Sequence, residues 1–158
     1  MNQSEEEILR LLENVFDPEI PVLNIVEMGI VRSVNIVQNE YRIEITPTYS
    51  GCPAMHTIEK DILDLLNSHG IKNVKIKRIY SPAWTTDCFS ESTKTKLKEY
   101  GIAPPVINIK EEFLKINRTC PFCDSDKTKT ISEFGSTSCK SLHYCDDCRQ
   151  PFEYFKCI

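Results

Sequence analysis

The chain is poor in glycine and histidine, and it has no long apolar run. Of its 158 residues, five are glycine, three are histidine and one is tryptophan. With so few glycines, the sequence contains neither a phosphate-binding loop nor a dinucleotide fingerprint. A nucleotide or flavin enzyme is therefore not expected. No apolar stretch approaches the roughly 20 residues that span a membrane. No paired Glu-x-x-His motif occurs, so we expect no di-iron oxygenase centre of the helical-bundle type.

Positive charge is also scarce. The chain has 19 lysines and arginines against 23 acidic residues, a net charge of −4. This balance disfavours nucleic acids and anionic membranes as partners, because neutralising phosphates requires clustered lysine and arginine. The first residues, MNQSEEEILRLLENVF, are acidic and have helical spacing, so no secretion signal is expected. We therefore expect a cytoplasmic protein with no nucleic-acid and no membrane partner.

Cysteine, in contrast, is abundant, with eight residues. In a reducing cytosol, paired cysteines bind metals or do chemistry. Two Cys-x-x-Cys pairs, Cys120/Cys123 and Cys145/Cys148, are separated by 21 residues (124–144). Two such turns can complete a tetrahedron of thiolates around Zn²⁺, at about 2.3 Å per sulfur. The pattern predicts a zinc ribbon rather than a rubredoxin-like iron site, because closed Cys₄ sites in small loop-rich segments mostly hold zinc.

The rest of the chain has the apolar spacing of a small α/β domain. Ser4 and Glu7 have capping-box spacing at the start of a first helix. The expected elements after it are strands at 30–37 and 41–46, a helix at 53–68, a strand at 74–79 and a helix at 90–100.

This order predicts an α+β fold class. The chain is expected to form a small α/β sandwich (α-β-β-α-β-α) over residues 1–103, followed by a C-terminal zinc ribbon. Residues 104–118 would form a linker, and the ribbon would occupy 119–158.

Cys52 is the strongest candidate for chemistry outside the ribbon. It lies in Ser50-Gly51-Cys52-Pro53, between an expected strand end and a helix start. Gly51 lets the backbone approach a ligand closely. A sulfur at a helix N-terminus is near unpaired N–H groups and the positive end of the dipole, which favours the thiolate. The alternative is a half-buried cysteine that packs as a small hydrophobe.

Two other segments are expected to converge on the same end of the sheet. Asp17 and Glu19 follow the first helix, and Thr86, Asp87 and Cys88 follow the third strand. An aspartate after a helix is more often a cap or turn former than a catalyst. Because Asp87 would raise the pKa of its neighbour, Cys88 is the weaker thiol candidate.

The remaining cysteines and histidines are expected to pack in the ribbon or to lie on the surface. Cys139 and Cys157 lie in the ribbon, where packing is the simplest role; ligand exchange at the metal and oxidation to a disulfide are the alternatives. His56, His69 and His143 are expected on the surface rather than at a metal.

Three motifs of the N-terminal part resemble the small iron–sulfur-assembly domain of bacterial and eukaryotic cytosolic maturation factors. They are DPEIPVL (17–23), TPTYSGCPA (46–54) and PAWTTD (82–87). In the related domains, the cysteine that matches Cys52 is the functional one.

The C-terminal part is similar to the D-subunit family of phenylacetyl-CoA epoxidase systems, PaaD (also written PaaJ). The similarity rests on CPFC (120–123), SEFGSTSCK (132–140) and PFEYFKCI (151–158). The chain departs from this family at Cys88, where the family pattern has tryptophan.

The resemblance implies a role in phenylacetate catabolism, where a multicomponent di-iron monooxygenase epoxidises an aromatic ring. Its reductase carries a plant-type [2Fe–2S] cluster and a flavin. The chain would be an accessory maturation protein, not an enzyme, which helps to assemble or repair that cluster. Cys52 would transiently hold iron or a nascent cluster, or form a mixed disulfide. Partners would be the oxygenase and reductase components, the iron–sulfur assembly machinery and a second copy, paired through exposed strand edges.

Two other functions are weighed against this one. The first is a stoichiometric subunit of the oxygenase complex, structural or electron-transferring. The second is a zinc-ribbon nucleic-acid module. Lys127, Lys129 and Lys140 would give the latter a small basic patch, but the acidic balance of the chain counts against it.

Overall fold

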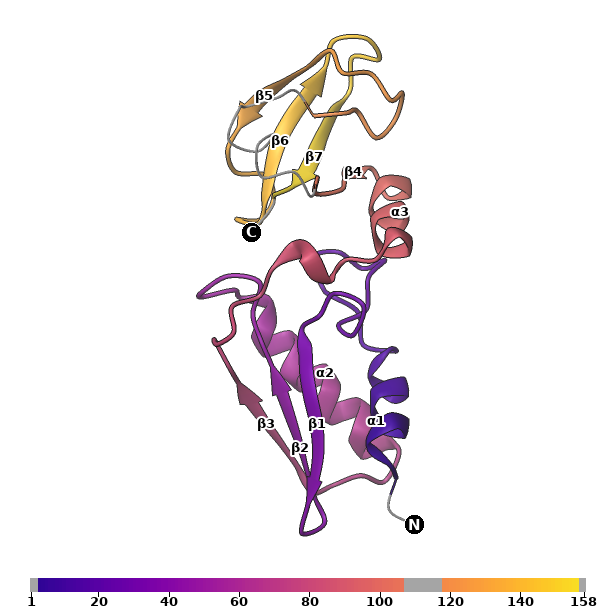
Figure 1. Cartoon of the computed structure of the whole chain (residues 1–158), viewed down its shortest axis with the longest axis vertical. Helices are drawn as coiled ribbons and strands as arrows, with labels where there is room; N and C mark the ends of the chain where they lie inside the picture. The colour runs from indigo at the N-terminus through magenta and orange to yellow at the C-terminus, as the bar shows by residue number, and fades with distance from the viewer. Residues whose placement is uncertain (1–2, 107–117, 157–158) are drawn as a thin grey trace. The chain divides into compact units, whose positions relative to one another are not determined.

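A computed structural model describes residues 3–106 and 118–156 of the chain (Figure 1). The chain divides into two compact units, Met1–Trp84 and Thr85–Ile158. Most of the predicted linker at 104–118 lies outside the described residues. The predicted domain bounds of 1–103 and 119–158 stay a prediction.

The first unit begins with helix α1, Glu5–Leu12. The Ser4 hydroxyl accepts the N–H of Glu7 at 3.2 Å, and the Glu7 carboxylate accepts the N–H of Ser4 at 2.8 Å. This reciprocal pair confirms the predicted capping box and supplies partners to N–H groups that a helix start leaves unpaired. Ile8 and Leu12 lie one turn apart and are both fully buried, so α1 has a single apolar face.

A three-stranded sheet follows, in the order β1-β2-β3. Strands β1 (Val31–Val37) and β2 (Glu40–Ile45) form an antiparallel hairpin. Gln38 and Asn39 connect them with φ values of 50° and 67°, as a two-residue hairpin turn requires. Strand β3 (Val74–Arg78) is parallel to β2, so the chain must cross over between them.

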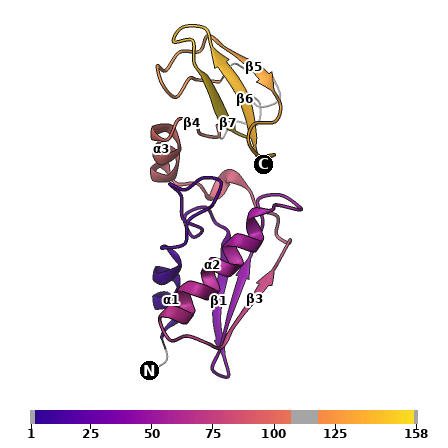
Figure 2. The same cartoon turned by 180° about the vertical axis from the view of Figure 1, so that it is seen from behind.

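The crossover is helix α2, Ala54–Ser68. Views from opposite sides show α1 and α2 on the same face of the sheet (Figures 1 and 2). The face of α2 that meets the core is apolar, and alternate residues of β2 point toward it. These inward side chains are Met55, Ile58, Ile62 and Leu66 on the helix and Tyr41, Ile43 and Ile45 on the strand. The two layers confirm the predicted α+β fold class.

The chain leaves the first unit at Trp84, the single tryptophan. The Trp84 side chain is 3% exposed, and its indole N–H donates to the carbonyl oxygen of Met28 at 2.7 Å. A buried indole N–H needs such a partner, so this bond fixes the end of the unit to its loop region. Among the described residues, none of the helices has the length and apolarity needed to cross a membrane.

The second unit contains a short 3-10 helix at Thr86–Cys88, helix α3 at Glu91–Glu99 and a four-stranded sheet. The sheet order is β4-β7-β6-β5, with β4 parallel to β7 and the other neighbours antiparallel. Its strands are β4 (Ile102–Ala103), β5 (Thr128–Ser132), β6 (Lys140–Cys145) and β7 (Pro151–Phe155). Helix α3 matches its prediction, whereas β4 was not predicted because two residues carry no periodicity.

A buried ion pair crosses the ribbon sheet. The Lys140 ammonium lies 3.1 Å from the Glu153 carboxylate, and the Lys140 side chain is 3% exposed. Glu153 also accepts the N–H of Ser136, which ties the loop before β6 to β7. A Cβ at Gly135 would lie 2.5 Å from a carboxylate oxygen of Glu153, so a larger residue at this position would make the end of the Glu153 side chain move.

The prediction of a surface position is wrong for His143, although His56 and His69 are exposed. His143 is 4% exposed, because it lies on the inward face of β6 with Ser141 and Cys145. Its ring stacks on Phe152 with centroids 5.5 Å apart, and its Nε2 is 2.8 Å from the Ser141 hydroxyl. Burial lowers the pKa of His143 to about 4, which keeps the ring neutral.

Candidate metal centre and thiol site

The structure brings the four predicted ligands of the ribbon together. The sulfur atoms of Cys120, Cys123, Cys145 and Cys148 all lie within 4.8 Å of one another. Two of the distances, Cys120 to Cys148 and Cys123 to Cys145, are 3.6 Å. A tetrahedron with metal–sulfur bonds of about 2.3 Å has edges of about 3.8 Å, so the sulfurs fit such a metal. They form a four-cysteine metal-binding site.

The two Cys-x-x-Cys turns have the same backbone geometry. The N–H of Cys120 donates to the carbonyl of Ser125 at 2.9 Å, and the N–H of Cys145 donates to the carbonyl of Gln150 at 3.0 Å. In each turn the residue that follows the second cysteine has a φ of 59°. This left-handed conformation is unfavourable for residues other than glycine. Both turns adopt it because it reverses the chain directly after the sulfur pair.

Backbone N–H groups of the second turn favour thiolate at Cys145, although burial raises the pKa of Cys148, in the same turn, to about 12. They lower the pKa of Cys145 to about 7, chiefly through the N–H of Cys148 and also through that of Asp147. The thiolate is the form that binds a metal. Cys120 and Cys145 are fully buried, whereas Cys123 is exposed. The centre therefore has one side near the surface.

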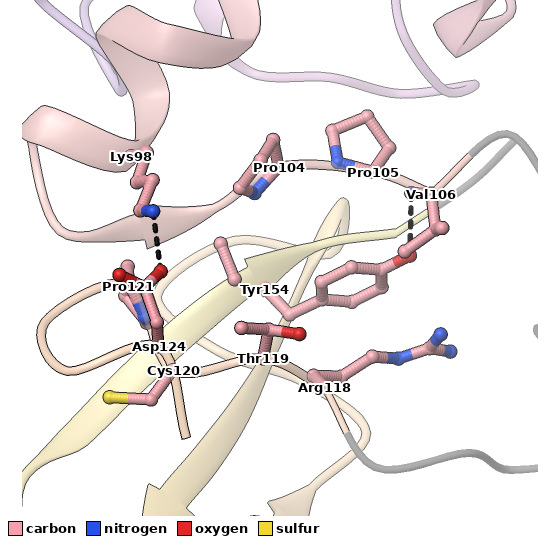
Figure 3. A pocket seen from close by; sticks show the side chains of 11 residues that line it. Lys98, Pro104, Pro105, Val106, Arg118, Thr119, Cys120, Pro121, Asp124 and Tyr154 are labelled. Atoms are coloured by element: carbon pink, nitrogen blue, oxygen red, sulfur yellow. Dashed lines mark hydrogen bonds and ion pairs between the residues drawn. The ribbon is translucent and has the colours of Figure 1, made fainter. Parts of the chain in front are cut away.

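A cavity of about 250 Å³ lies in the second unit beside Cys120 (Figure 3). Pro104 and the Tyr154 ring contribute apolar walls. An ion pair between Lys98 and Asp124, 2.5 Å long, lies at one side of it. None of the predicted thiol-site residues lines this cavity, which is instead a neighbour of the metal centre.

Cys52 lies in a tight turn between β2 and α2. The N–H of Cys52 donates to the carbonyl of Tyr49 at 3.3 Å, and Gly51 has a φ of +81°. A β-turn with glycine at its third position accounts for both values. The side chain of Cys52 is half-buried, and the N–H of Ala54, the first residue of α2, donates to its sulfur. The sequence therefore placed Cys52 correctly at a helix start.

The loop after α1 brings two carboxylates to the same place. Asp17 and Glu19 both act on Cys52 through their charge. Asp17 is 6% exposed, and its Oδ1 accepts the N–H groups of Glu19 and Ile20, each at 2.8 Å. Asp17 is thus a turn former, as expected for an aspartate that follows a helix, and it also contributes negative charge to the thiol site.

The expectation that the helix start favours thiolate at Cys52 is wrong for this site. The pKa of Cys52 is raised above its ordinary value, first by burial and then by the charges of Glu19 and Asp17. The Ala54 N–H and the Tyr49 hydroxyl act in the opposite direction, but they do not balance burial. Desolvation and negative neighbours both disfavour an anion, which explains the direction.

Thr86, Asp87 and Cys88 form the short 3-10 helix of the second unit. Thr86 is buried, whereas the thiol of Cys88 is exposed and donates to the carbonyl of Thr85 at 3.1 Å. The convergence of these three residues with Cys52 stays a prediction.

Cys139 packs inside the ribbon. Cys139 is 4% exposed, and its sulfur lies 3.0 Å from the Thr137 hydroxyl, consistent with a packing role. Cys157 lies outside the described residues. Sequence reasoning also missed Tyr49 as a neighbour of Cys52, although Gly51 between them was a signal for a tight turn.

Comparison with known families divides the chain in two. Residues 5–77 match the family described as iron-sulfur cluster assembly protein. Residues 108–156 match the PaaD zinc beta ribbon domain.

The N-terminal part has relatives among maturation factors and solved structures. A Porphyromonas gingivalis protein named Fe-S protein maturation auxiliary factor is 36% identical over 60% of this chain and 91% of its own. The Bacillus subtilis factor YitW is 32% identical over 58% of this chain and 91% of its own. The solved structure of a domain of unknown function (DUF59) from Bacillus anthracis has a TM-score of 0.54 at 29% identity. It covers 59% of this chain and 90% of that domain.

One relative matches nearly the whole chain. An Escherichia coli (strain K12) protein, named as the D subunit of 1,2-phenylacetyl-CoA epoxidase, is 45% identical over 152 residues. These residues cover 96% of this chain and 92% of that protein. The match includes both the assembly-type domain and the ribbon. With this similarity and the ribbon match, the chain belongs to the family of phenylacetyl-CoA epoxidase D subunits, PaaD.

Proposed function

We propose that this chain is an accessory maturation factor of the phenylacetyl-CoA epoxidase system, which assists assembly or repair of the iron–sulfur cluster of the reductase. The observation that carries the proposal is Cys52, a thiol at the start of α2 in a unit that matches the iron–sulfur assembly family. Two relatives of that unit are named as maturation auxiliary factors, which supports an accessory role.

The available metal ligands also support an accessory role. Within residues 3–106 and 118–156, the four ribbon cysteines are the one group of side chains arranged to hold a metal. A di-iron oxygenase centre needs carboxylates and histidines that project from facing helices. We therefore assign oxygen activation and reductant handling to other components of the system.

In this proposal Cys52 is the handover thiol. A thiolate is a soft ligand that suits iron and sulfur cargo and can exchange between partners. It would transiently hold iron or a nascent cluster, or form a mixed disulfide with a partner. Asp17 and Glu19 shape the site from the loop after α1, and Thr86, Asp87 and Cys88 are proposed to complete it.

The ribbon would hold Zn²⁺ on its four cysteines and dock the client protein. Zinc of this closed Cys₄ type is structural and contributes folding free energy. The protein would act in the cytoplasm, with the oxygenase and reductase components and the iron–sulfur assembly machinery as partners. Pairing of two copies through an open strand edge stays a prediction.

Exchange of Cys52 for serine tests the proposal. Cells that carry Cys52→Ser should make reductase with a depleted cluster and intact flavin, measured as the ratio of iron to flavin and by visible absorption. Thr57→Ser, a small change at an exposed position of α2 outside the proposed site, is the matched control. Reductase with a full cluster in the Cys52→Ser cells would contradict the proposal.

The name of the Escherichia coli relative favours a second candidate, a stoichiometric subunit of the oxygenase complex. Under the maturation proposal, purified oxygenase that is fully loaded with its metals and cluster should turn over without this protein. Under the subunit alternative, the same loaded enzyme would stay inactive until this chain is added in a stoichiometric amount.

A further inference from the structure

The two Cys-x-x-Cys turns of the ribbon are joined by a side-chain contact outside the cysteines. The first turn is closed by a bond of 2.9 Å from the Cys120 N–H to the Ser125 carbonyl. The hydroxyl of the same serine donates to Oδ2 of Asp147, which lies inside the second turn, at 2.6 Å. Ser125 therefore bonds to one turn through its backbone and to the other through its side chain.

The Asp147 carboxylate uses both of its oxygens on residues that follow the first turn. Oδ2 accepts the Ser125 hydroxyl, and Oδ1 lies 3.2 Å from the Lys127 ammonium. The Ser125 hydroxyl oxygen also accepts the N–H of Lys127 at 3.1 Å, so the three residues form a closed ring of contacts. We call Ser125, Lys127 and Asp147 the latch. The Lys127 side chain is 76% exposed, so the Ser125 bond to the carboxylate contributes more to the latch than the ion pair does.

A metal centre made of cysteines needs such a link between its two halves. The four sulfurs lie within 4.8 Å of one another, where thiolates without a metal repel one another. Asp147 stands between two of the ligands in the sequence, Cys145 and Cys148, so holding its side chain limits the movement of both. Contacts of this kind, outside the ligands themselves, orient metal ligands, and losing one lowers the affinity for the metal.

We propose that Asp147 is a positioning residue for the metal centre: through Ser125 and Lys127 it holds the second Cys-x-x-Cys turn at the metal-binding distance from the first. The proposal rests on the zinc of the proposed function, but it does not use the handover role of Cys52. A site that is ordered before the metal arrives binds it more tightly, because less freedom is lost on binding. The latch therefore sets how tightly the ribbon retains its metal.

The test is the zinc affinity of the purified full-length protein, measured by competition with a chromogenic chelator under reducing conditions. Asp147→Ala and Ser125→Ala should each lower this affinity about 3- to 10-fold, at the low end of outer-shell effects because Asp147 is partly exposed. The two losses should not add in Ser125→Ala/Asp147→Ala, because each single change already breaks the same bond. Ser125→Thr keeps a hydroxyl and should retain the wild-type affinity.

Asp146→Ala is the matched control. Asp146 precedes Asp147 in the same turn, but its carboxylate pairs with Lys129 of β5, at 2.9 Å, instead of with Ser125. The zinc affinity of this variant should stay within about twofold of the wild type. Visible absorption of the Co²⁺-loaded proteins is a second measurement. Thiolate bands of wild-type shape in the weakened variants would support a change of position, whereas the bands of a site with fewer thiolates would overturn it.

Three results of the affinity measurement would also overturn the proposal. They are an unchanged affinity in Asp147→Ala, an equal loss in Asp146→Ala, and losses that add in the double variant. A wild-type protein that binds zinc tightly, together with unchanged variants, would refute the latch and leave the zinc assignment in place. A wild-type protein that binds neither zinc nor Co²⁺ would refute the zinc assignment and the latch together.

Discussion

The two compact units bury different kinds of side chain. The first unit packs aliphatic residues of two helices against a three-stranded sheet, and many of its large side chains are almost completely inaccessible. They include Ile8, Leu12, Ile43, Ile45, Ile58 and Ile62. The second unit has a small core in which aromatic rings and cysteines share the space, namely Ala103, Cys120, Cys145, Phe152 and Tyr154. An aliphatic core is stable through burial of apolar area, whereas a small core of this kind needs a metal.

The pKa shifts of the thiols do not follow the division into units, because burial raises the pKa of the ribbon ligand Cys148 to about 12. Cys145 has backbone donors that lower its pKa to about 7, as suits a permanent ligand. Cys52 has a raised pKa because of burial and the charges of Glu19 and Asp17. A thiol that remains protonated until a partner arrives does not retain metals indiscriminately. In the proposed function, the ribbon keeps its zinc and Cys52 holds its cargo only transiently.

Loss of the metal site should give the largest effect and should separate the two units. In Cys120→Ser/Cys145→Ser, zinc content should fall from about one per chain to near zero, and the second unit should unfold, because structural zinc binding supplies about 10 kcal/mol or more. The emission of Trp84, which is buried in the first unit, should stay characteristic of an apolar site. Cys88→Ser, which removes an exposed thiol, is the control.

Full zinc content in the double variant would refute the ligand assignment. A Trp84 emission that shifts to that of an exposed indole would mean that the first unit depends on the metal as well.

A cavity in the aliphatic core should destabilise the first unit and leave the metal in place. Ile62→Ala, at a fully buried position of α2, should lower the free energy of unfolding by about 2–5 kcal/mol. Leu63→Ala changes the next residue on the same helix, which is 37% exposed, and should cost well under about 1 kcal/mol. Urea unfolding followed by Trp84 fluorescence measures both, together with zinc content. Equal losses for the two variants, or zinc loss in either, would count against the comparison.

A bidentate ion pair between α2 and β3 should give a smaller, pH-dependent effect. Arg78 donates to both carboxylate oxygens of Glu59, at 2.5 and 2.9 Å, and this hydrogen bonding lowers the pKa of Glu59. A lowered pKa means that the stabilisation is present above the unfolded-state pKa and is lost as pH falls through the folded-state pKa. Glu59→Gln should therefore lower the free energy of unfolding at pH 7 by about 0.2–1 kcal/mol, with the difference vanishing in acid.

The matched control is Asp64→Asn. Its partner Lys60 is 3.8 Å away, and both side chains are more than half exposed, so the free energy of unfolding at pH 7 should change by less than about 0.5 kcal/mol. A Glu59→Gln difference that grows toward low pH would contradict the sign.

The smallest expected effect is that of changing Cys88, in the short 3-10 helix of the second unit. Cys88→Trp should retain most activity in a phenylacetate growth assay, because Cys88 is exposed and relatives are expected to have tryptophan at this position. A folded but inactive Cys88→Trp would make Cys88 the partner of Cys52 and would remove the division of roles between the two units.

Features that depend on neighbours in sequence were predictable. The capping box at Ser4 and Glu7, the apolar stripe of α2 and the two Cys-x-x-Cys pairs each depend on residues three or four positions apart. Such spacings fix local geometry before any tertiary contact forms. The start of α2 after Cys52 was predictable for the same reason.

Features that depend on residues far apart in the sequence were not predictable. The direction of the Cys52 pKa shift depends on burial and on carboxylates more than 30 residues earlier in the chain, so the helix start alone gave the wrong sign. His143 lies inward because the register of β6 against β7 puts it over Phe152. Strand β4 has two residues, and its pairing with β7 leaves no periodic signal.

The inaccessible ammonium of Lys140 gives the ribbon an internal reporter for chemical footprinting. With 3% of its side chain exposed and its charge held by Glu153, Lys140 should escape amine-reactive labels that modify surface lysines such as Lys127. Chelation or ligand mutation should make Lys140 label at the rate of its neighbours, because opening the sheet releases the ion pair. Labelling inside cells could then show what fraction of this protein carries its metal, without purification.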